Sequence, residues 1–526
     1  MNSKRPVMLM ILDGWGNSAV QEGNAVAQAD PPFLRRLSEE YPTTRLLCSG
    51  EAVGLPPGVM GNSEVGHLNI GAGRIVYQDL MRINKAIEDG SLWKNPTLTD
   101  LMDRVIQAGS TLHLAGLVSD GGVHSDLDHL LALLEMAKER GVPRTAVHAI
   151  TDGRDTSPTS GVQFVKTVVE WIRSHQYGEI ATICGRYFAM DRDQRWDRTE
   201  RAYRLLTRGE GRPETNPVTA VRDAYERGET DEFIPPVAMT DESGSPLARV
   251  KKGDGFFFFN FRADRARQLA RAFTEASFAE FDRGERIPLT GFATMTRYDA
   301  AFDLPAAFPP VQLKGILGEV VAKAGKRQLR IAETEKYAHV TYFFNGGEET
   351  PFPGEERVLI PSPREVATYD AKPEMSAPEV TEAVLERLSQ DRFDLIVLNF
   401  ANMDMVGHTG DIEAAVAACK TVDRCAERIV GEVLKRGGAV AVTSDHGNAE
   451  MMRDAAGNVH TAHTLNPAPF ILVDDDRKSA RLAEGKLGDI APTLLELMGV
   501  AQPDEMTGRS LLNGQSSSKG PRKEES

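Results

Sequence analysis

The sequence has few cysteines and no long apolar run. Its four cysteines form no CxxC pair, which argues against a cysteine metal site or a disulfide framework and favours free thiols in a reducing compartment. No apolar stretch approaches the roughly 18 residues that a membrane-spanning helix needs. The apolar run near the N-terminus ends at Asp13 without a signal-peptide cleavage site. We therefore expect a cytoplasmic protein with no membrane partner.

The chain also lacks an excess of positive charge. It carries 61 lysines and arginines against 76 aspartates and glutamates, a net charge of −15. This balance argues against general binding to nucleic acid, although it allows a local basic pocket. The hydrophobic fraction of 41% and charged fraction of 26% are those of a globular protein, and 526 residues are enough for two or three domains.

Short apolar runs alternate with amphipathic stretches along most of the chain. Such alternation predicts an α/β fold with mainly parallel sheets covered by helices on both faces. Two helices are expected to begin at Ser125 and at Ser376, the latter with a capping box to Glu379. The predicted strands are 6–12, 110–118, 145–150, 179–184, 255–261, 393–400, 437–443 and 469–473.

Chemically distinct side chains lie next to the ends of these strands, where open parallel sheets bind their ligands. Those near the two ends of the chain are acids and imidazoles: Asp13, Asp404, His408, Asp445, His446 and His463. Those in the middle are mostly arginines: Arg154, Arg186, Arg192, Arg262 and Arg265, with His124 and Asp155 nearby.

The two sets occupy separate parts of the sequence. The Asp/His set lies within 1–76 and 311–511, and the arginine set lies within 77–310. This separation predicts an outer α/β domain made of both ends of the chain, with a second α/β domain inserted into it. The polar residues 512–526 are expected to form a disordered tail.

The Asp/His set has the composition of a divalent-metal site. Mixed carboxylate and imidazole ligands suit Zn²⁺, Mn²⁺ or similar ions. Six candidates exceed one tetrahedral site and suit two metals about 3.5–4 Å apart, an arrangement used for phosphoryl displacement. Taken alone, Asp13 is better explained as a turn residue than as a metal ligand. We expect His67 to be structural and His460 to be exposed to solvent.

The stretch "GVMGNSEVGHLNIGAGR" (58–74) surrounds Ser63 with small and polar residues. Ser63 is therefore either a turn residue or a nucleophile. A serine beside a divalent metal becomes a candidate nucleophile, because such a metal lowers the pKa of bound water from 15.7 to about 7 and acts similarly on a hydroxyl. The flexible run would also leave backbone N–H groups free for phosphate oxygens.

The arginine set predicts a substrate that carries both a phosphate and a carboxylate, because guanidinium groups match the oxygens of each. The alternative is a set of surface salt bridges with Asp191, Asp193 and Asp264. Asp155 could act as a general base for a hydroxyl or serve as a salt-bridge partner. Lys336 could hold a phosphate as a point charge.

Ten motifs occur in a fixed order between residue 5 and about residue 511. They are "LMILDGWG", "GVMGNSEVGHLNIGAGR", "GLVSDGGVHS", "TDGRDTSP", "GRYFAMDRD", "NFRADRARQ", "AETEKYAHVTYFFNGG", "NMDMVGHTGD", "TSDHGNAE" and "AHTLNP". In these motifs the sequence resembles the cofactor-independent (2,3-bisphosphoglycerate-independent) phosphoglycerate mutases of the alkaline phosphatase superfamily.

The resemblance implies a phosphatase-like domain that holds two divalent metals and a smaller domain that binds the substrate. One metal would be bound by Asp404, His408 and His463, and the other by Asp13, Ser63, Asp445 and His446. The substrate would be contacted by His124, Arg154, Asp155, Arg186, Arg192, Arg262, Arg265 and Lys336. Mn²⁺ is the expected metal, with Mg²⁺, Co²⁺ and Zn²⁺ as alternatives.

The predicted function is interconversion of 3-phosphoglycerate and 2-phosphoglycerate, in glycolysis and gluconeogenesis, by a monomer that needs no bisphosphoglycerate. Ser63 would carry the phosphoryl group, Asp155 would deprotonate the accepting hydroxyl, and Lys336 would assist. The nearest alternative is a metal-dependent phosphomonoesterase or another phosphomutase. A noncatalytic polyanion-binding protein would leave Ser63 and the Asp/His set without a role.

Overall fold

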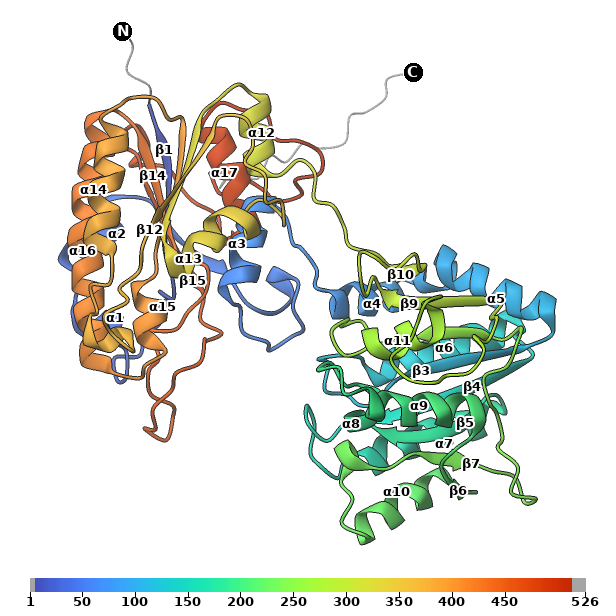
Figure 1. Cartoon of the computed structure of the whole chain (residues 1–526). Helices are drawn as coiled ribbons and strands as arrows, with labels where there is room; N and C mark the ends of the chain where they lie inside the picture. The colour runs from blue at the N-terminus through green and yellow to red at the C-terminus, as the bar shows by residue number, and fades with distance from the viewer. Residues whose placement is uncertain (1–4, 513–526) are drawn as a thin grey trace, which may run out of the picture. The chain divides into compact units, whose positions relative to one another are not determined.

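The structure, a computed structural model, describes residues 5–512 and forms two compact units (Figure 1). Unit 1 comprises Met1–Gln78 and Gln312–Ser526, and unit 2 comprises Asp79–Val311. The predicted disordered tail lies, apart from Leu512, outside the described residues. Within 5–512, no helix is long and apolar enough to cross a membrane.

Unit 1 is built on a mainly parallel eight-stranded sheet. Strand β1 lies at its centre and pairs in parallel with β13 and β14, whereas β15 runs antiparallel to β14 and β2. In order across the sheet, the strands are β12 (Glu355–Ile360), β11 (Gln328–Glu333), β13 (Leu395–Phe400), β1 (Val7–Leu12), β14 (Ala439–Thr443), β15 (Ala468–Val473), β2 (Thr43–Leu47) and β16 (Gly485–Lys486).

Helices cover both faces of this sheet, because successive residues of the buried strands point to opposite sides. Met8 and Met10 of β1 belong to a core shared with α2 (Pro32–Glu40), α14 (Ala377–Leu388) and α16 (Ile412–Lys435). Leu9 and Ile11 belong to a core on the other side, shared with α3 (Ser63–Ala72), α12 (Leu317–Lys323) and α17 (Ile490–Leu497). Shorter helices are α1 (Ala25–Ala29), α13 (Thr334–Ala338) and α15 (Asn402–Gly407).

Unit 2 contains a second eight-stranded sheet, in which β3 pairs in parallel with β4 and β8. Its strands, in order, are β10 (Ala306–Phe308), β9 (Gly291–Thr296), β8 (Gly255–Phe258), β3 (Thr111–Leu117), β4 (Arg144–Thr151), β5 (Glu179–Gly185), β7 (Val237–Met239) and β6 (Arg212–Glu214). Only the β5–β7 pair is antiparallel among the strand pairs of this sheet that the structure describes.

The helices of unit 2 also form two layers. Leu112 and Leu114 of β3 share a core with α4 (Asp79–Glu88), α5 (Pro96–Ala108), α6 (Leu127–Arg140), α7 (Gly161–His175) and α10 (Pro217–Glu226). Ala115 and Leu117 share the opposite core with α8 (Arg186–Ala189), α9 (Trp196–Arg208) and α11 (Arg267–Thr274). Each unit is thus a three-layered α/β arrangement, as the sequence predicts.

All eight predicted strands are present, but Ser125 is not the cap of its helix, and Ser376 occupies the predicted cap position without a capping hydrogen bond. The helix α6 begins after Asp126, whose side chain accepts from the N–H of Asp128. The Ser125 hydroxyl donates instead to the carbonyl of Leu117. Helix α14 begins after Ser376, as predicted, but the Ser376 hydroxyl donates to the carbonyl of Pro361 and forms no capping hydrogen bond or capping box. In both cases the hydroxyl is turned toward a backbone carbonyl of another segment, and its oxygen accepts no hydrogen bond from the first turn of the helix.

Candidate active site

One edge of the unit 1 sheet gathers the predicted Asp/His set. Asp13 follows β1, Asp404 lies on α15 just after β13, and Asp445 follows β14. Lys336 lies on α13, directly after β11. Because β15 is antiparallel, the loop that precedes it reaches the same edge and brings His463 there. Parallel strands end at a common edge, so segments far apart in sequence meet.

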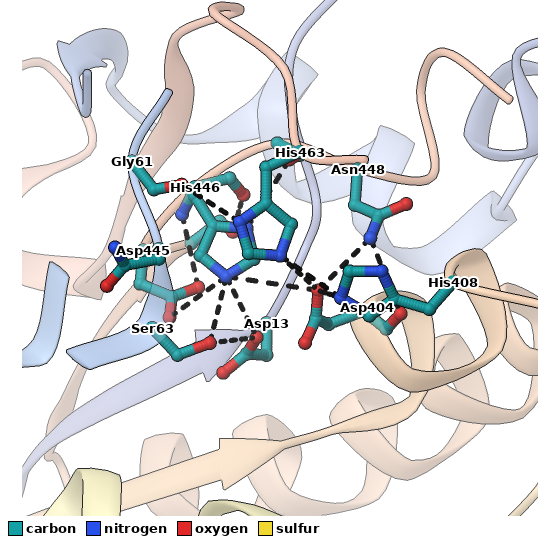
Figure 2. A network of polar contacts seen from close by, with 12 residues as sticks. Asp13, Gly61, Ser63, Asp404, His408, Asp445, His446, Asn448 and His463 are labelled. Atoms are coloured by element: carbon teal, nitrogen blue, oxygen red, sulfur yellow. Dashed lines mark hydrogen bonds and ion pairs between the residues drawn. The ribbon is translucent and has the colours of Figure 1, made fainter. Parts of the chain in front are cut away.

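Ser63 is the first residue of α3, so it is a helix residue rather than a turn residue. The helix is capped by Asn62, whose side chain accepts from the N–H of Val65 at 2.9 Å. Ser63 Oγ lies 2.9 Å from His446 Nε2 and 3.3 Å from Asp13 Oδ1 (Figure 2). The positive end of a helix dipole favours anions such as phosphate. The hydroxyl therefore lies where an incoming phosphoryl group would be stabilised.

Two glycines allow backbone segments to come this close. A Cβ atom on Gly66, in α3, would lie 2.8 Å from the Cβ atom of Asp445. Gly14 has φ of 76°, and a Cβ atom there would lie 2.6 Å from the Cα atom of Asp404. Larger residues would push α3 and α15 away from the strand ends.

Two histidines direct their ring nitrogens onto Asp404. His408 Nδ1 lies 2.7 Å from the Thr461 carbonyl oxygen, and His463 Nδ1 lies 2.9 Å from the Gly61 carbonyl oxygen. These carbonyls hold each Nδ1 as the N–H donor, which leaves the Nε2 lone pairs for another partner. Both Nε2 atoms lie 3.2 Å from Asp404 Oδ1 and 3.1 Å from each other (Figure 2). Such convergence of lone pairs suits a metal ion.

Lys336 lies in the middle of the acidic groups. Its Nζ is 2.6 Å from Asp404 Oδ2, 2.8 Å from Asp13 Oδ1 and 2.7 Å from Ser63 Oγ. Burial alone would lower the pKa of Lys336, but the charges of Asp13 and Asp404 raise it above its ordinary value. Its side chain is thus a fixed positive charge that touches the candidate nucleophile.

His446 lies in the same negative field. Burial works against its charged form, but the carboxylates of Asp445 and Asp404 raise the pKa of His446 to about 10. Burial likewise works against ionisation of Asp404, but the charges of Lys336 and His446 hold its pKa well below the ordinary value. This strongly negative pocket suits cations.

The donor set fits divalent metals. Among residues 5–512, two groups place one ligand atom per residue within 4.8 Å of one another: Asp404, His446 and His463, and Asp13, His67 and Asp445. Asp445 Oδ2 is buried and accepts no hydrogen bond. His446 Nε2 lies between the groups, 3.4 Å from Asp13 Oδ1 and 3.9 Å from Asp404 Oδ1. All seven predicted ligands lie in this cluster, and their division between two metals stays a prediction.

Glu450 ties the loops of the site together and was not predicted from the sequence. This buried carboxylate accepts from the N–H groups of Gly16 and Asn448 at 3.0 and 2.8 Å, and from Asn466 Nδ2 at 2.9 Å. Thr464 also donates to it. Three loops that carry candidate ligands are therefore held by one side chain. Its place inside the motif "TSDHGNAE" is the only signal in the sequence.

In unit 2 the predicted substrate residues also lie at one edge of the sheet. Arg186 is buried, and its Nη1 lies 2.5 Å from Asp152 Oδ1 and 2.6 Å from Asp155 Oδ2. Asp152 also accepts from the hydroxyl of Ser119 and the N–H groups of Arg154 and Asp155. Asp152, which was not predicted, shapes the loop that carries Arg154 and Asp155.

Two further arginines are paired with a carboxylate, and a buried histidine lies beside the same carboxylate. Arg192 and Arg262 both contact Asp264, at 2.9 and 3.2 Å. His124 Nδ1 is buried without a hydrogen-bond partner, 3.6 Å from Asp264 Oδ1. Burial, and then the nearby positive charge of Arg186, lowers the pKa of His124 to about 4. The salt bridges expected under the alternative interpretation are thus partly present.

Arg154 and Arg265 complete this cluster. Arg154 forms an ion pair with Glu232, and Arg265 donates to the carbonyl of Met190 at 3.2 Å. Burial, followed by the like charges of Arg154 and Arg192, lowers the pKa of Arg265. Guanidinium groups close enough to repel one another favour an anionic ligand among them.

Comparison with known proteins separates the two units in the same way. A family model described as "BPG-independent PGAM N-terminus" matches residues 83–300. A second model, "Type I phosphodiesterase / nucleotide pyrophosphatase", matches residues 314–496.

Similar proteins match nearly the whole chain. The 2,3-bisphosphoglycerate-independent phosphoglycerate mutase of Syntrophotalea carbinolica is 57% identical over 509 residues, 97% of this chain and 98% of that protein. The protein of the same name from Moorella thermoacetica is 59% identical over 509 residues, with the same coverage. Among solved structures, Leishmania mexicana phosphoglycerate mutase at low cobalt concentration is similar, with 32% identity, a TM-score of 0.59 and 97% of each chain covered.

Proposed function

This chain belongs to the family of 2,3-bisphosphoglycerate-independent phosphoglycerate mutases, which interconvert 3-phosphoglycerate and 2-phosphoglycerate, and we propose that Ser63 carries the phosphoryl group between two half-reactions. The relatives that match 97% of the chain are named as mutases, which decides against the phosphomonoesterase alternative. The observation that supports the serine mechanism is the position of Ser63 Oγ, 2.7 Å from Lys336 Nζ and 2.9 Å from His446 Nε2 at the start of α3.

We propose that the site holds two divalent metals, with Mn²⁺ as the first choice because four of the seven candidate ligands are oxygen donors. Bound divalent cations would supply Lewis-acid stabilisation of phosphoryl charge and would lower the pKa of a coordinated hydroxyl. The residues that would hold them are Asp404, His408 and His463 for one ion, and Asp13, Ser63, Asp445 and His446 for the other.

The residues of unit 1 perform the transfer in this proposal. Ser63 Oγ attacks phosphorus in line and gives up its proton, so the Oγ–P bond forms while the P–O bond to the glycerate breaks. The released glycerate oxygen takes up one proton, which balances the one that Ser63 loses. The ammonium group of Lys336 neutralises charge that develops on the transferred group. The N–H groups at the start of α3 act on the same charge. In the second half-reaction the serine oxygen is the leaving group.

The residues of unit 2 hold the glycerate in this proposal. The arginines bind its carboxylate through paired N–H donors. Asp155 accepts the proton of whichever hydroxyl attacks the phosphoserine, which determines the product isomer. Asp155 Oδ2 lies 2.6 Å from Arg186 Nη1, so the guanidinium holds this carboxylate in a fixed position.

Three further properties belong to the proposal. We propose that the enzyme is a cytoplasmic monomer, that phosphoglycerate is its small-molecule partner, and that it binds neither nucleic acid nor membranes. The net charge of −15 supports the absence of nucleic-acid and membrane binding. The spacing of the cysteines supports a reducing compartment such as the cytoplasm. Sedimentation at several protein concentrations tests the monomer: a mass above 57.6 kDa that rises with concentration would contradict it.

The decisive experiment uses purified protein of defined metal content with 3-phosphoglycerate, with and without added bisphosphoglycerate. We expect equal formation of 2-phosphoglycerate in both cases, little free phosphate, and a phosphorylated Ser63 peptide after acid quenching. Ser63→Ala should lower kcat by roughly 10⁴-fold or more while the protein keeps its metal, and the matched buried variant Ser376→Ala should stay active. Unchanged turnover in Ser63→Ala would remove the serine mechanism.

A further inference from the structure

A buried asparagine interrupts the apolar strand β13, "LIVLNF". Asn399 is completely buried and faces two groups of the active site. Its Nδ2 lies 2.8 Å from Asp13 Oδ2 and 3.0 Å from His67 Nε2. A polar side chain in the centre of a sheet is costly unless it is hydrogen-bonded, so these contacts indicate a specific role.

The hydrogen-bond directions in this cluster follow from chemistry. The Asp13 carboxylate only accepts, so the amide nitrogen of Asn399, rather than its oxygen, must face it. The second N–H of that nitrogen then points at His67 Nε2. A nitrogen that faces a donor must itself accept, so Nε2 carries the lone pair and Nδ1 carries the hydrogen.

The other ring nitrogen of His67 is also engaged. His67 Nδ1 lies 2.9 Å from the carbonyl oxygen of Ser63, one turn earlier in α3. It also lies 3.1 Å from Asp445 Oδ2, which accepts no well-directed hydrogen bond. His67 is completely buried, and neither ring nitrogen has a lone pair left for another partner.

We propose that Asn399 and His67 are positioning residues, which link Asp13 to the backbone of Ser63 through three hydrogen bonds and fix the nucleophile relative to its acidic neighbour. His67 lies close enough to Asp13 and Asp445 to be a metal ligand by distance alone. Because both ring nitrogens of His67 already take part in hydrogen bonds, His67 holds other residues of the site in place and does not bind a metal. This inference rests on the proposed metal site of unit 1.

The connection is needed because its ends come from different parts of the fold. Asp13 follows the central strand β1, whereas Ser63 begins a helix on one face of the sheet. Asn399 lies on the neighbouring strand β13, where Ile11 is its register partner.

Residues that orient metal ligands typically change metal affinity or activity by about 10–100-fold when they are replaced. A loosened Ser63 should lower kcat and leave KM for phosphoglycerate unchanged, because substrate binding is not touched.

Nitrogen-15 NMR of histidine-labelled protein tests the tautomer without any variant. In metal-free protein we expect His67 to show an unprotonated, pyridine-type Nε2 and a protonated Nδ1. Addition of Mg²⁺ or Zn²⁺ should leave that pattern in place. A large shift of either His67 nitrogen on metal addition, or an Nε2–H tautomer, would overturn the proposal.

Variants separate a positioning role from ligation. His67→Gln keeps one acceptor and one donor, whereas His67→Phe keeps neither. We expect His67→Phe to weaken Mn²⁺ binding by about 10–100-fold and to lower kcat at saturating metal, with KM unchanged. His67→Gln should restore most of both, and Asn399→Leu should match His67→Phe. A ligand role predicts instead that Gln and Phe lose one equivalent of metal alike, while Asn399→Leu keeps it.

The chain offers a matched control in unit 2. His129 is a buried histidine on α6, and its Nε2 lies 2.7 Å from Asn84 Oδ1. His129→Phe should disturb folding to a similar degree and leave Mn²⁺ affinity unchanged. If His129→Phe and His67→Phe weaken Mn²⁺ binding equally, the effect is general destabilisation and the proposal fails. If wild-type protein binds no divalent metal, the proposed function fails instead, whatever the NMR shows.

Discussion

The two units present their functional side chains in opposite ways. In unit 1 the side chains of Asp13, Asp445 and His446 are 0% exposed. In unit 2 those of Arg192 and Arg262 are 46% and 51% exposed. Groups that make and break bonds work best when they are fixed in a site of low dielectric constant. Groups that capture an anion from solution can keep their hydration and rest on exchangeable carboxylate partners until the ligand arrives.

Both units also contain residues that depart from this contrast. Arg186 in unit 2 is 2% exposed, held by Asp152 and Asp155. His408 in unit 1 is 41% exposed although it faces Asp404. A buried arginine suits a fixed point of attachment for the substrate, and an exposed ligand suits a route by which metal enters. The predictions below test the contrast and its exceptions.

Lys336→Met should show the largest effect. It removes the ammonium group from Asp13, Asp404 and Ser63, so two buried carboxylates lose their cation. We expect kcat to fall by about 10²–10³-fold and the metal-free protein to lose about 3–5 kcal/mol of stability. Steady-state kinetics and urea unfolding measure the two. Lys323→Met, at an exposed pair on α12, is the control, and equal behaviour of both variants would refute the role of Lys336.

Arg186→Met should show the next effect, on stability more than on chemistry. It leaves Asp152 and Asp155 without their buried partner, which should destabilise the protein by about 3–4 kcal/mol. KM for 3-phosphoglycerate should rise as well. Thermal unfolding of the variant with and without substrate measures both. An unchanged melting temperature would show that Arg186 contributes no more to stability than the exposed arginines do, and its burial would then have no special role.

Much of this arrangement could be predicted from the sequence. The buried strands are apolar and end in short motifs that carry Asp, His or Arg, and parallel pairing brings such motifs to one edge. Strand β11 was missed because Gln328 and Arg330 are polar but buried. Arg330 Nη2 donates to Gln328 Oε1 at 2.7 Å, and its guanidinium lies 4.5 Å from the ring centroid of Phe344.

The supporting residues could not be predicted in the same way. Asp152, Glu232 and Glu450 contact residues that lie distant in sequence, so no local pattern marks them as partners. We expected His67 to be structural, and its contacts show which parts of the site it connects, namely Asn399 and the backbone of Ser63. The pattern of apolar residues locates the ends of strands. The residues that hold the site residues in place are identified only once the tertiary fold is known.

Glu333→Gln tests burial of a carboxyl without a cation. Unlike Asp404, Glu333 is hydrogen-bonded by the Ser362 hydroxyl at 2.8 Å and the Ser376 backbone rather than by a cation, and burial raises the pKa of Glu333 from 4.5 to about 7. A carboxyl group whose pKa is higher in the folded protein than in the unfolded chain stabilises the fold in its protonated form. This stabilisation is complete below the pKa of the unfolded chain and is lost as the pH rises through the pKa of the folded protein. A shift of this size corresponds to about 3 kcal/mol.

Wild type should therefore lose stability relative to Glu333→Gln between pH 4.5 and about 7. The variant should be the more stable protein by about 2–3 kcal/mol near pH 8.5 and close to wild type near pH 4.5. Urea unfolding at the two pH values measures the difference. Glu386→Gln, whose side chain is 67% exposed, is the control and should show no such dependence. A pH-independent gap between wild type and Glu333→Gln would contradict the assignment.

Arg192→Ala should show the smallest effect and sharpens the contrast at its exposed end. Arg192 contacts Asp264 at 2.9 Å and keeps 46% of its side chain exposed, so its removal leaves no buried charge unpaired. We expect unchanged stability, an unchanged kcat and a KM for 3-phosphoglycerate raised by about tenfold, since a solvated charge-assisted hydrogen bond contributes about 1.5 kcal/mol. The increase should shrink at high salt, because exposed charges are screened.

Asp264→Asn, which frees Arg192 from its partner, should lower the KM for 3-phosphoglycerate. A fall in kcat at constant KM would place Arg192 at the reacting atoms, and the division between a buried reacting unit and an exposed binding unit would then be wrong.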